Sequence, residues 1–420
     1  MKAWAAGLVG LALSVGVAEA QDADGAGRSA SAWSRAGLTG SLRLALWSSN
    51  RELDDETARP VATAWLKVAP DEWRGFTFLF EGRAQARGTL ERVDDAVGVR
   101  DAFMSRRLGS LDLRVGRQVI PWGRADGINP TDNLTPRDFT MLAANDADDR
   151  LGASALKATW HRGGLSLTGV WLPEFVPHVV PLPVPPGATL DDTPVDGPRR
   201  RWGVRLDQSG AAVDWSVSWF EGPDLAPDLG VDQRRRITLG YPRVRVVGGD
   251  AVAVVGRYAL RLEAAYTATP DADGTNPFVR NPFALVVAGI ERTFREYANI
   301  NVQYVGRFVR RHGAIPSSLG PQETAVARQH AILANQTSGA QHGLTVRVAN
   351  RWRRETLDAE VAAAGFLGPA GYVVKPRIAW SVTDRWKLVA GGDWFDGDDE
   401  SFYRLLRQNA AFFTELRWSF

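Results

Sequence analysis

Charged side chains recur inside apolar, alternating segments of this sequence, and they are the residues best able to do chemistry. In "LRLEAAY", for example, Arg261 and Glu263 alternate with Leu260, Leu262 and Ala264. A row of charges that faces an aqueous interior focuses the electric field on passing ions. Basic residues outnumber acidic ones at the positions that we assign to such a pore-lining face: Arg43, Arg83, Arg114, Arg205, Arg261, Glu263, Arg307, Arg347, Arg377, Glu415 and Arg417.

Two interpretations of these charges stay open. In the first, they line a pore and give it a modest preference for anions. In the second, they form ion pairs between neighbouring strands and brace the wall, and pairs of this kind contribute little to selectivity. The reversal potential under a salt gradient distinguishes the two interpretations.

The stretch "GRQVIPWGRADGINPTDNLTPRDFTML" is the strongest candidate for a constriction. It contains Asp-Gly and Asn-Pro turn signals, and Thr135, Pro136 and Asp138 predict the first turn of a short helix. A loop of this length either folds into the lumen or packs outside as a cap, and both alternatives stay open. The residues that we assign to the constriction are Arg117, Gln118, Trp122, Asn129 and Asp132.

The start of this stretch poses a problem of spacing. Arg114 and Arg117 are three residues apart, so they cannot both face inward on a regular strand. We therefore expect a β-bulge near the outer rim, which would re-aim Arg117 or Gln118.

Two further segments predict structured outer loops. The proline-rich "PEFVPHVVPLPVPPG" favours a stiff, extended and apolar segment at the pore mouth. "PQETAVARQHAILAN" predicts a short helix with Val326, Ile332 and Leu333 on its apolar side. Either segment could act as a lid or a plug, or form an ordinary surface loop.

The five histidines give no support for a metal or cofactor site, and we expect no cofactor. They are His161, His178, His312, His330 and His342, and no two of them have metal-ligand spacing. Neither a Gly-x-Ser-x-Gly element nor a phosphate-binding glycine loop occurs. An outer-membrane hydrolase is the rival of another class, but it requires a Ser or an acid beside a His at the rim. We expect no enzymatic activity.

Period-two alternation along almost the whole chain indicates the elements that position these residues. In "FTFLFEGRAQA", Phe76, Phe78 and Phe80 share one face, while Glu81 and Arg83 lie on the other. About 18 such segments of roughly 10 to 12 residues occur, the length of tilted membrane-spanning strands. The sequence predicts an all-β fold, a transmembrane antiparallel up-and-down β-barrel over residues 36–420, with 16 strands as the alternative.

Connection lengths support the barrel independently. Connections after even-numbered strands are mostly tight, as in "GS", "SG" and "TDR", whereas the long ones, 121–150, 173–200, 267–282 and 310–342, follow odd-numbered strands. Short turns on the periplasmic side and long loops outside are typical of outer-membrane barrels. Two places fit poorly: the tenth strand, predicted near Ile237, is followed by the long "VRVVGGDAVAVVGRY", and "LGPAG" is a short outer loop.

Aromatic residues indicate two belts at the membrane interfaces. By strand parity, Trp352, Trp386, Trp418 and Phe420 fall near the periplasmic rim. A closed barrel pairs its last strand with its first, which explains a strand that runs to Phe420. The outer rim receives the other predicted belt: Trp171, Trp202, Tyr266, Phe308, Tyr372 and Trp394.

The first residues and the amino-acid composition indicate where the protein is located and which partners it has. Residues 1–20 have a basic start, a short apolar stretch and small residues at Ala18 and Ala20, which predicts a signal peptide followed by a periplasmic segment over 21–35. The sequence has no cysteine, so neither disulfides nor thiolate metal sites form. With 50 basic and 48 acidic residues, the net charge of +2 gives no reason to expect nucleic acid as a partner.

Several motifs together resemble a known family. "LRVGRQVIPWG", "INPTD", "GRYALRLEAAY", "NINVQYVGRFV" and the final stretch from "YVVKPRIAWS" to "FFTELRWSF" are similar to uncharacterised proteobacterial outer-membrane barrels whose genes often accompany RND-type exporters. A Gly-Arg-Gln element also occurs in other porin-like barrels, such as alginate-export channels. The resemblance implies transport of small, hydrophobic or amphiphilic molecules, and exporter components as partners.

These observations lead to one expected function and one alternative. We expect a porin-like channel in the outer membrane of a Gram-negative bacterium, which passes or exports small amphiphilic or anionic solutes and contacts membrane lipid and lipopolysaccharide. The alternative is a non-conducting accessory that binds cargo for an RND-type export system.

Overall fold

A computed structural model describes residues 36–49, 58–88, 93–180, 182, 190–191, 199–210, 212–232, 236–295 and 297–420. The predicted signal peptide (1–20) and periplasmic segment (21–35) lie outside the described residues.

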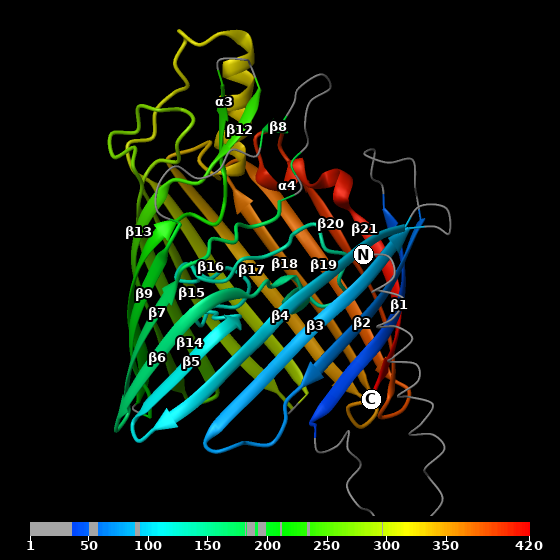
Figure 1. Cartoon of the computed structure of the whole chain (residues 1–420). Coiled ribbons are helices and arrows are strands. Elements are labelled where there is room, and N and C mark those ends of the chain that lie inside the picture. Colours follow the sequence, from blue (N-terminus) through cyan, green and yellow to red (C-terminus); the bar gives the residue numbers. More distant parts are fainter. Residues whose placement is uncertain are drawn as a thin grey trace, which may run out of the picture.

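Eighteen antiparallel strands form one closed barrel, which confirms the predicted fold and strand number (Figure 1). Each strand pairs with the next one in the barrel, and the last pairs with the first. The barrel strands are β1 (Leu38–Ser49), β2 (Ala58–Val68), β3 (Phe76–Gly88), β4 (Val93–Leu108), β5 (Leu111–Gln118), β6 (Ala153–Arg162), β7 (Leu165–Leu172), β9 (Arg201–Gln208), β10 (Val213–Pro223), β13 (Arg243–Val255), β14 (Tyr258–Ala268), β15 (Phe283–Phe294), β16 (Ala298–Val309), β17 (Ala340–Trp352), β18 (Leu357–Leu367), β19 (Ala370–Ser381), β20 (Trp386–Gly397) and β21 (Ala411–Ser419).

The remaining elements lie in the connections. A small sheet joins β11 (Asp228–Val231) to β12 (Ile237–Gly240) and β8 (Leu190–Asp191), and α3 (Pro321–Leu333) lies with it above the open end of the barrel (Figure 1). The others are η1 (Asp146–Asp149), α4 (Phe402–Leu405) and η2 (Arg407–Asn409). No helix among the described residues is long and apolar enough to span a bilayer.

Closure of the barrel depends on the pairing of β1 with β21. Their register runs from Ser41 opposite Ser419 to Ser49 opposite Ala411. Beyond the last paired residue of β21, Gly40 and Phe420 exchange two backbone hydrogen bonds, of 3.0 and 3.1 Å. The pairing continues to the end of the chain and leaves no open sheet edge in the barrel.

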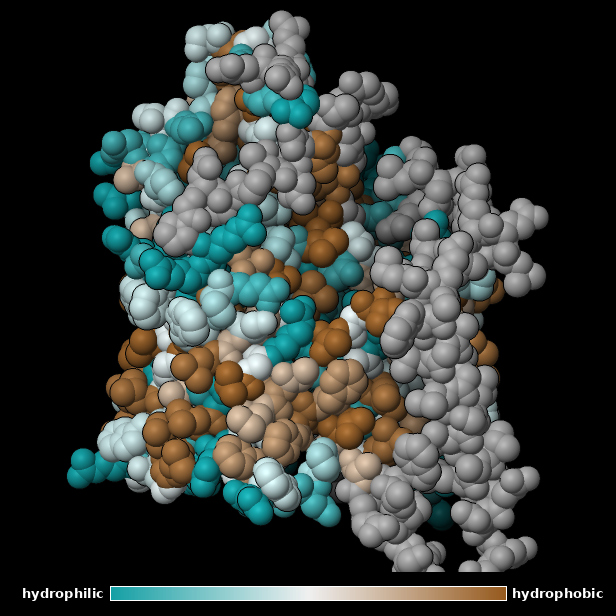
Figure 2. All heavy atoms as spheres, viewed as in Figure 1, coloured by the Kyte–Doolittle hydropathy of each residue, from teal (hydrophilic) through white to brown (hydrophobic). Residues whose placement is uncertain are grey.

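The outward face is apolar because alternate residues of each strand project from it. Leu44, Val217 and Val247 are among many large apolar side chains that are more than half exposed. Figure 2 shows hydrophobic residues gathered in the lower half of the face in view, with more hydrophilic residues above them. An apolar belt of this kind is stable only where it contacts lipid.

The aromatic side chains border this belt as the alternation predicted. Trp171 and Trp202 lie opposite each other near the end with the long loops, and Trp386 and Trp418 lie opposite each other at the other end. Trp352, Trp386, Tyr266, Phe308, Tyr372 and Trp394 are all exposed outward.

Two of the following local predictions require correction, and the third is confirmed. The tenth barrel strand is β13, whereas the predicted start, Ile237, belongs to the outer sheet; "VRVVGGDAVAVV" is itself the strand, and the turn is Gly256–Arg257. No helix begins at Thr135; Arg137 and Asp138 instead form isolated β-bridges, with Arg150 and Val179. The helix predicted at 321–335 is present as α3.

The irregularity expected at Arg117 lies one hairpin earlier. β5 pairs with β6 in a regular register, and the shift occurs between Glu81 and Gly82 of β3, opposite β4. Arg117 therefore stays on the outward face of β5, beside Ser154 of β6, while Gln118 faces inward.

Candidate functional site

One long connection, residues 119–152 (the inner loop), folds into the barrel. Figure 1 shows it as a teal coil between the strands, and its contacts reach inward-facing residues on several sides of the wall. Of the two alternatives for this segment, the structure therefore has the loop inside rather than a cap outside.

Glu263 of β14 is the anchor on one side. Its Oε2 accepts hydrogen bonds from the backbone N–H groups of Arg124 and Ala125, and its Oε1 accepts from the N–H and hydroxyl of Thr131, all at 2.9 Å. The residue is only 1% exposed. A buried carboxylate is stable because several donors satisfy both oxygens, so this side chain fixes two turns of the inner loop.

The opposite end of the inner loop is held by β1 and β3. Arg43 forms a 2.6 Å ion pair with Asp148, and Gln85 donates a hydrogen bond to the carbonyl of Leu142. Beside them, Trp47 stacks on Phe413 of β21 at 4.4 Å between ring centroids. These two rings and Val61, Ala144, Val389 and Ala411 form a buried cluster, which joins the inner loop to the wall near the barrel seam.

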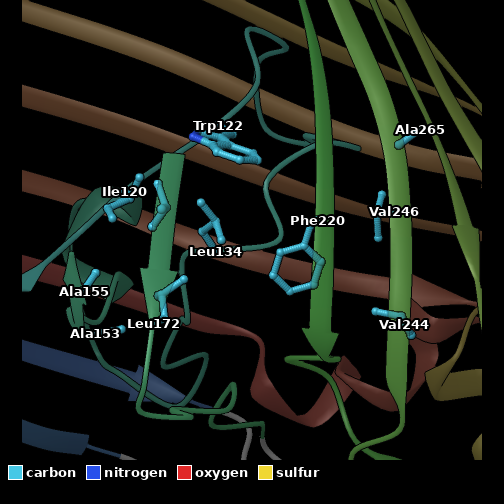
Figure 3. Close-up of a cluster of buried hydrophobic side chains, with 11 residues drawn as sticks. Ile120, Trp122, Leu134, Ala153, Ala155, Leu172, Phe220, Val244, Val246 and Ala265 are labelled. Atoms are coloured by element: carbon cyan, nitrogen blue, oxygen red, sulfur yellow. The ribbon is translucent and has the colours of Figure 1, made fainter. Parts of the chain in front are cut away.

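A second apolar cluster fills the space between the inner loop and the wall from β6 to β14 (Figure 3). Figure 3 shows Trp122 and Leu134 of the inner loop together with Phe220 and Leu172 from the strands. Trp122 lies over Gly203 so closely that a Cβ at Gly203 would be 2.5 Å from its ring. Dense packing of this kind leaves no passage along this part of the wall.

The inner loop also contacts the wall from β16 to β18, more loosely. Asp126 accepts a 3.4 Å hydrogen bond from Asn301 and lies 3.7 Å from Arg347. Arg347 also forms a 2.6 Å ion pair with Glu360 of β18. The charges of Asp126, Arg347 and Glu360 thus border the space that stays open.

That space consists of two cavities along β17 to β21. The outer one has a volume of about 950 Å³ and the inner one about 290 Å³. Both are lined by Asn145, Glu360, Ala362 and Lys375, so they adjoin where the inner loop comes nearest to β18 and β19. The described residues therefore leave open space along this wall, and the two cavities meet beside these four residues.

The inner cavity is predominantly basic. Lys375, Arg377, Lys387 and Arg417 line it, against Asp358 and Glu360. Both arginines of this lining have acidic neighbours outside it: Arg377 pairs with Asp393 and Arg417 pairs with Glu415, each at 2.7 Å. No ion pair of Lys387 occurs among the described residues, so its charge is available to a solute.

The outer cavity combines charges with exposed apolar side chains. Phe139 of the inner loop is 51% exposed, and its ring lies 5.3 Å from that of His178. Leu142, Phe395 and Phe402 also line this cavity. Apolar surface that faces an aqueous cavity is typical of a site that receives an apolar part of a ligand.

Few of the predicted pore-lining residues reach the two cavities. Arg347 lines the outer cavity, and Arg377 and Arg417 line the inner one. Glu263 is covered by the inner loop, Glu415 is 6% exposed, and Arg307 is buried over the ring of Phe283. The others have partners in the wall or the inner loop: Arg43 with Asp148, Arg83 with Asp138 and Met141, Arg114 over Phe103, Arg205 with Asp207 and Asp250, and Arg261 with Glu291.

The residues assigned to the constriction also separate. Asn129 lines the outer cavity, whereas Trp122 and Gln118 are buried against the wall. Arg117 faces outward and lies 3.7 Å from Glu174. Asp132 accepts a hydrogen bond from the Trp122 N–H, and burial raises the pKa of its carboxyl group.

Above the barrel, α3 and the small outer sheet pack around one apolar cluster. Leu229, Ile237, Leu239, Tyr241 and Val326 are buried there, and Leu333 packs against them. His330 accepts a hydrogen bond from the Leu229 N–H, and burial lowers its pKa to about 3. The apolar side predicted for this helix thus covers the outer sheet.

His178, from the proline-rich segment, joins that segment to the inner loop. Its Nδ1 accepts a 2.9 Å hydrogen bond from the Arg137 N–H. Burial lowers the pKa of His178 to about 4, and nearby arginines contribute to that lowering. The neutral ring therefore holds the two loops together at neutral pH.

His161 has the acid and serine neighbours that the hydrolase alternative requires. Its Nδ1 lies 2.9 Å from the Ser166 hydroxyl, and its Nε2 lies 2.9 Å from Asp112. The acid is also 3.6 Å from Arg107 and its side chain is 42% exposed, whereas the acid that orients a catalytic histidine is normally buried. The alternation of β5, β6 and β7 brings these residues together, a pairing that spacing in the sequence could not reveal.

Several residues of the cavities were not singled out from the sequence. Asp126 and Phe139 lie on the inner loop, and Phe402 and Tyr403 lie on the outer connection between β20 and β21. No local periodicity marks them, because the path of each loop is set by its partners in the wall. Lys387 alternates regularly in β20 and could have been found from strand parity.

Comparison with known proteins supports the fold. No protein-family profile matches the sequence, and no curated protein matches it significantly. Similar solved structures include Pseudomonas aeruginosa OccK11 (OpdR; 11% identity, 91% of this chain and 95% of that chain, TM-score 0.53). Others are P. aeruginosa OpdK with vanillate (8%, 91% and 97%, 0.54) and Acinetobacter baumannii OccAB3 (8%, 91% and 98%, 0.52). With its apolar belt and closed strand order, the chain has the fold of a porin-like outer-membrane β-barrel.

Proposed function

We propose that this chain is a channel of the Gram-negative outer membrane that passes small amphiphilic or anionic solutes. The observation that carries the proposal is the pair of adjoining cavities along β17 to β21, one with exposed apolar side chains and one with four basic residues. A solute with an apolar body and an anionic group finds a complement in each cavity.

The basic residues that line the inner cavity support an anion preference more strongly than the predicted pore-lining arginines do. Most predicted pore-lining arginines have an acidic or aromatic partner, as the bracing interpretation expects. The basic side chains of the lining are concentrated in the inner cavity, at Lys375, Arg377, Lys387 and Arg417. Field focusing in a narrow, low-dielectric passage makes a local excess more effective than the net charge of the barrel.

The test is the current through purified protein in a planar bilayer under a KCl gradient. We expect discrete conductance with a reversal potential on the anion side, and concentration-dependent block by vanillate, an aromatic carboxylate. A cation-selective current would contradict the anion preference. Silent bilayers combined with saturable vanillate binding would instead support the cargo-binding accessory of an RND-type exporter.

A second candidate activity is ester hydrolysis, which the hydrogen-bonded row of Asp112, His161 and Ser166 favours. In this mechanism His161 accepts the Ser166 proton as the serine oxygen attacks an ester carbonyl, the alcohol leaves, and water then hydrolyses the acyl-serine. Turnover of p-nitrophenyl acetate that is lost in Ser166→Ala but retained in Ser154→Ala would support it. If the wild type and both variants show the same background rate of hydrolysis, the row of Asp112, His161 and Ser166 only braces neighbouring strands.

A further inference from the structure

The outward face of β7, β9, β10 and β13 changes character toward the long-loop end of the barrel. On these strands Val204, Val217 and Val247 are exposed and apolar, and the exposed Trp219 lies opposite Val204 and Val247. Nearer the long loops, Trp171 and Trp202 lie opposite each other, and both are exposed. Figure 2 shows a similar change on the face in view, with brown residues gathered in the lower half and more hydrophilic residues above them.

Directly beyond these tryptophans, the surface becomes basic. Trp202 lies opposite Glu221, and Glu221 lies opposite Arg245 in the next strand. We call the following set the rim patch, in which five arginines face two glutamates: Arg117, Arg199, Arg200, Arg243, Arg245, Glu174 and Glu221.

Ion pairs neutralise only part of the rim patch. Glu221 is shared between Arg243, at 3.1 Å, and Arg245, at 3.4 Å. The Arg243 guanidinium also donates to the backbone carbonyl of Arg200, which brings these two chain segments together. Arg199 and Arg200 are exposed and have no ion pair among the described residues, and the Arg245 side chain is 72% exposed.

Two basic residues at the other rim lie against aromatic rings. Arg106 lies over the ring of Phe76, and Arg292 lies over the rings of Phe294 and Tyr258. Arg162 and Arg385 at that end are exposed, so exposed charge alone does not distinguish the two rims. What distinguishes the rim patch is that its arginines lie at the long-loop end, next to Trp171 and Trp202.

Guanidinium groups bind phosphate through paired hydrogen bonds, and these hydrogen bonds are stronger at a partly dehydrated interface. The rim patch lies at the end with the long loops, which faces outward in outer-membrane barrels. A second copy of this chain is a poor occupant, because two positive patches repel each other. We propose that the rim patch binds the phosphorylated headgroup of an outer-leaflet glycolipid, the lipid A part of lipopolysaccharide.

The double variant Arg200→Gln/Arg245→Gln tests this proposal. It removes two exposed charges and leaves the Arg243–Glu221 pair in place. The matched control is Arg162→Gln/Arg385→Gln, which removes the same charge from exposed positions at the short-turn end. Binding of lipid A, of dephosphorylated lipid A and of inorganic phosphate is measured by native mass spectrometry on folded protein in detergent, and conductance of each variant is recorded in parallel.

We expect lipid A to bind the wild type and the control at least about tenfold more tightly than the double variant. Dephosphorylated lipid A should bind all three proteins weakly. Equal lipid A binding by all three proteins would overturn the proposal. So would a wild type that binds dephosphorylated lipid A as tightly as lipid A. Complete displacement of lipid A by millimolar phosphate would also overturn it, in favour of a site for the free anion. The conductance recordings keep this proposal separate from the channel proposal. If the double variant binds lipid A weakly but conducts like the wild type, the rim patch binds lipid and plays no part in conduction.

Discussion

Thr131 donates both its backbone N–H and its hydroxyl to the same oxygen of Glu263, each at 2.9 Å, although the two residues are 132 positions apart. The inner loop is therefore positioned by one buried carboxylate of β14. Because Ala125, whose N–H donates to this carboxylate, also lines the outer cavity, the shape of that cavity depends on this anchor.

Replacing Glu263 by Gln should loosen the inner loop. The amide group turns one acceptor into a donor that faces other donors, which costs about 1–3 kcal/mol. We expect lower thermal stability and a larger, noisier single-channel current. Glu291→Gln, which affects only contacts within the wall, with Arg261 and Asn299, serves as the control. A quiet, wild-type current from Glu263→Gln would show that the loop is held elsewhere.

A methyl group at Gly203 should displace Trp122. The added Cβ would lie 2.5 Å from the indole ring, and overpacking of this kind costs about 1–3 kcal/mol. Gly203→Ala is therefore expected to unfold at lower temperature or denaturant concentration than the wild type. Gly169→Ala is the matched control, because Gly169 lies in the adjacent strand with no atom near the added carbon. Equal stability of the two variants would contradict the packing argument.

Reversing the charge of Lys387 should weaken the anion preference. The residue lies in the inner cavity, opposite Arg417 of the next strand, and a carboxylate there would neutralise part of the basic lining. In Lys387→Glu, we expect the reversal potential under a KCl gradient to move toward the cation side. Arg385→Glu makes the same charge change in the preceding turn, outside the cavities, and should leave the potential unchanged.

Acid should release the outer contact of the inner loop. His178 has a pKa of about 4 in the folded state, below the ordinary histidine pKa of 6.5, so the open state binds more protons between these limits. The contact with the Arg137 N–H is therefore at full strength above pH 6.5, weakens as the pH falls toward 4, and changes little below that, a loss of at most about 3 kcal/mol.

The weakening of the contact between His178 and Arg137 can be measured as noise in the single-channel current, recorded from pH 7.5 to 4.5. We expect the noise to rise as the pH falls. In His178→Gln the side-chain amide oxygen still accepts a hydrogen bond but does not titrate in this range, so the rise should be absent. His312→Gln, at an exposed position in another outer loop, should behave as the wild type. An identical pH response in His178→Gln would assign the effect to another group, such as His330.

The wall of the barrel could be predicted because lipid and water act on alternate residues of every strand. The aromatic pair Trp171 and Trp202 lies where parity put it, and 18 strands form as counted. The one misplaced strand, at Ile237, fails for a physical reason: a short apolar segment that covers α3 resembles a short segment that faces lipid. Local pattern does not distinguish the two environments.

The lumen was less predictable, because parity says which side a residue faces and not what covers it. Glu263 and Arg307 face inward as expected, yet the inner loop and the outer connections bury them. Thr135 and Pro136 satisfy the rules for a helix start, but the chain there forms bridges to Arg150 and Val179 instead. Contacts between residues more than a hundred positions apart decide these cases, and no local rule includes them.

The pairing of β1 with β21 sets the order in which the molecule can be completed. The partners of residues 41–49 are residues 411–419, so the seam cannot form before almost the whole chain has been synthesised. Until then, both edge strands carry unsatisfied N–H and C=O groups that would pair with any extended peptide. An unclosed barrel of this protein therefore has two open edges at once, and the pairing of β1 with β21 removes both together.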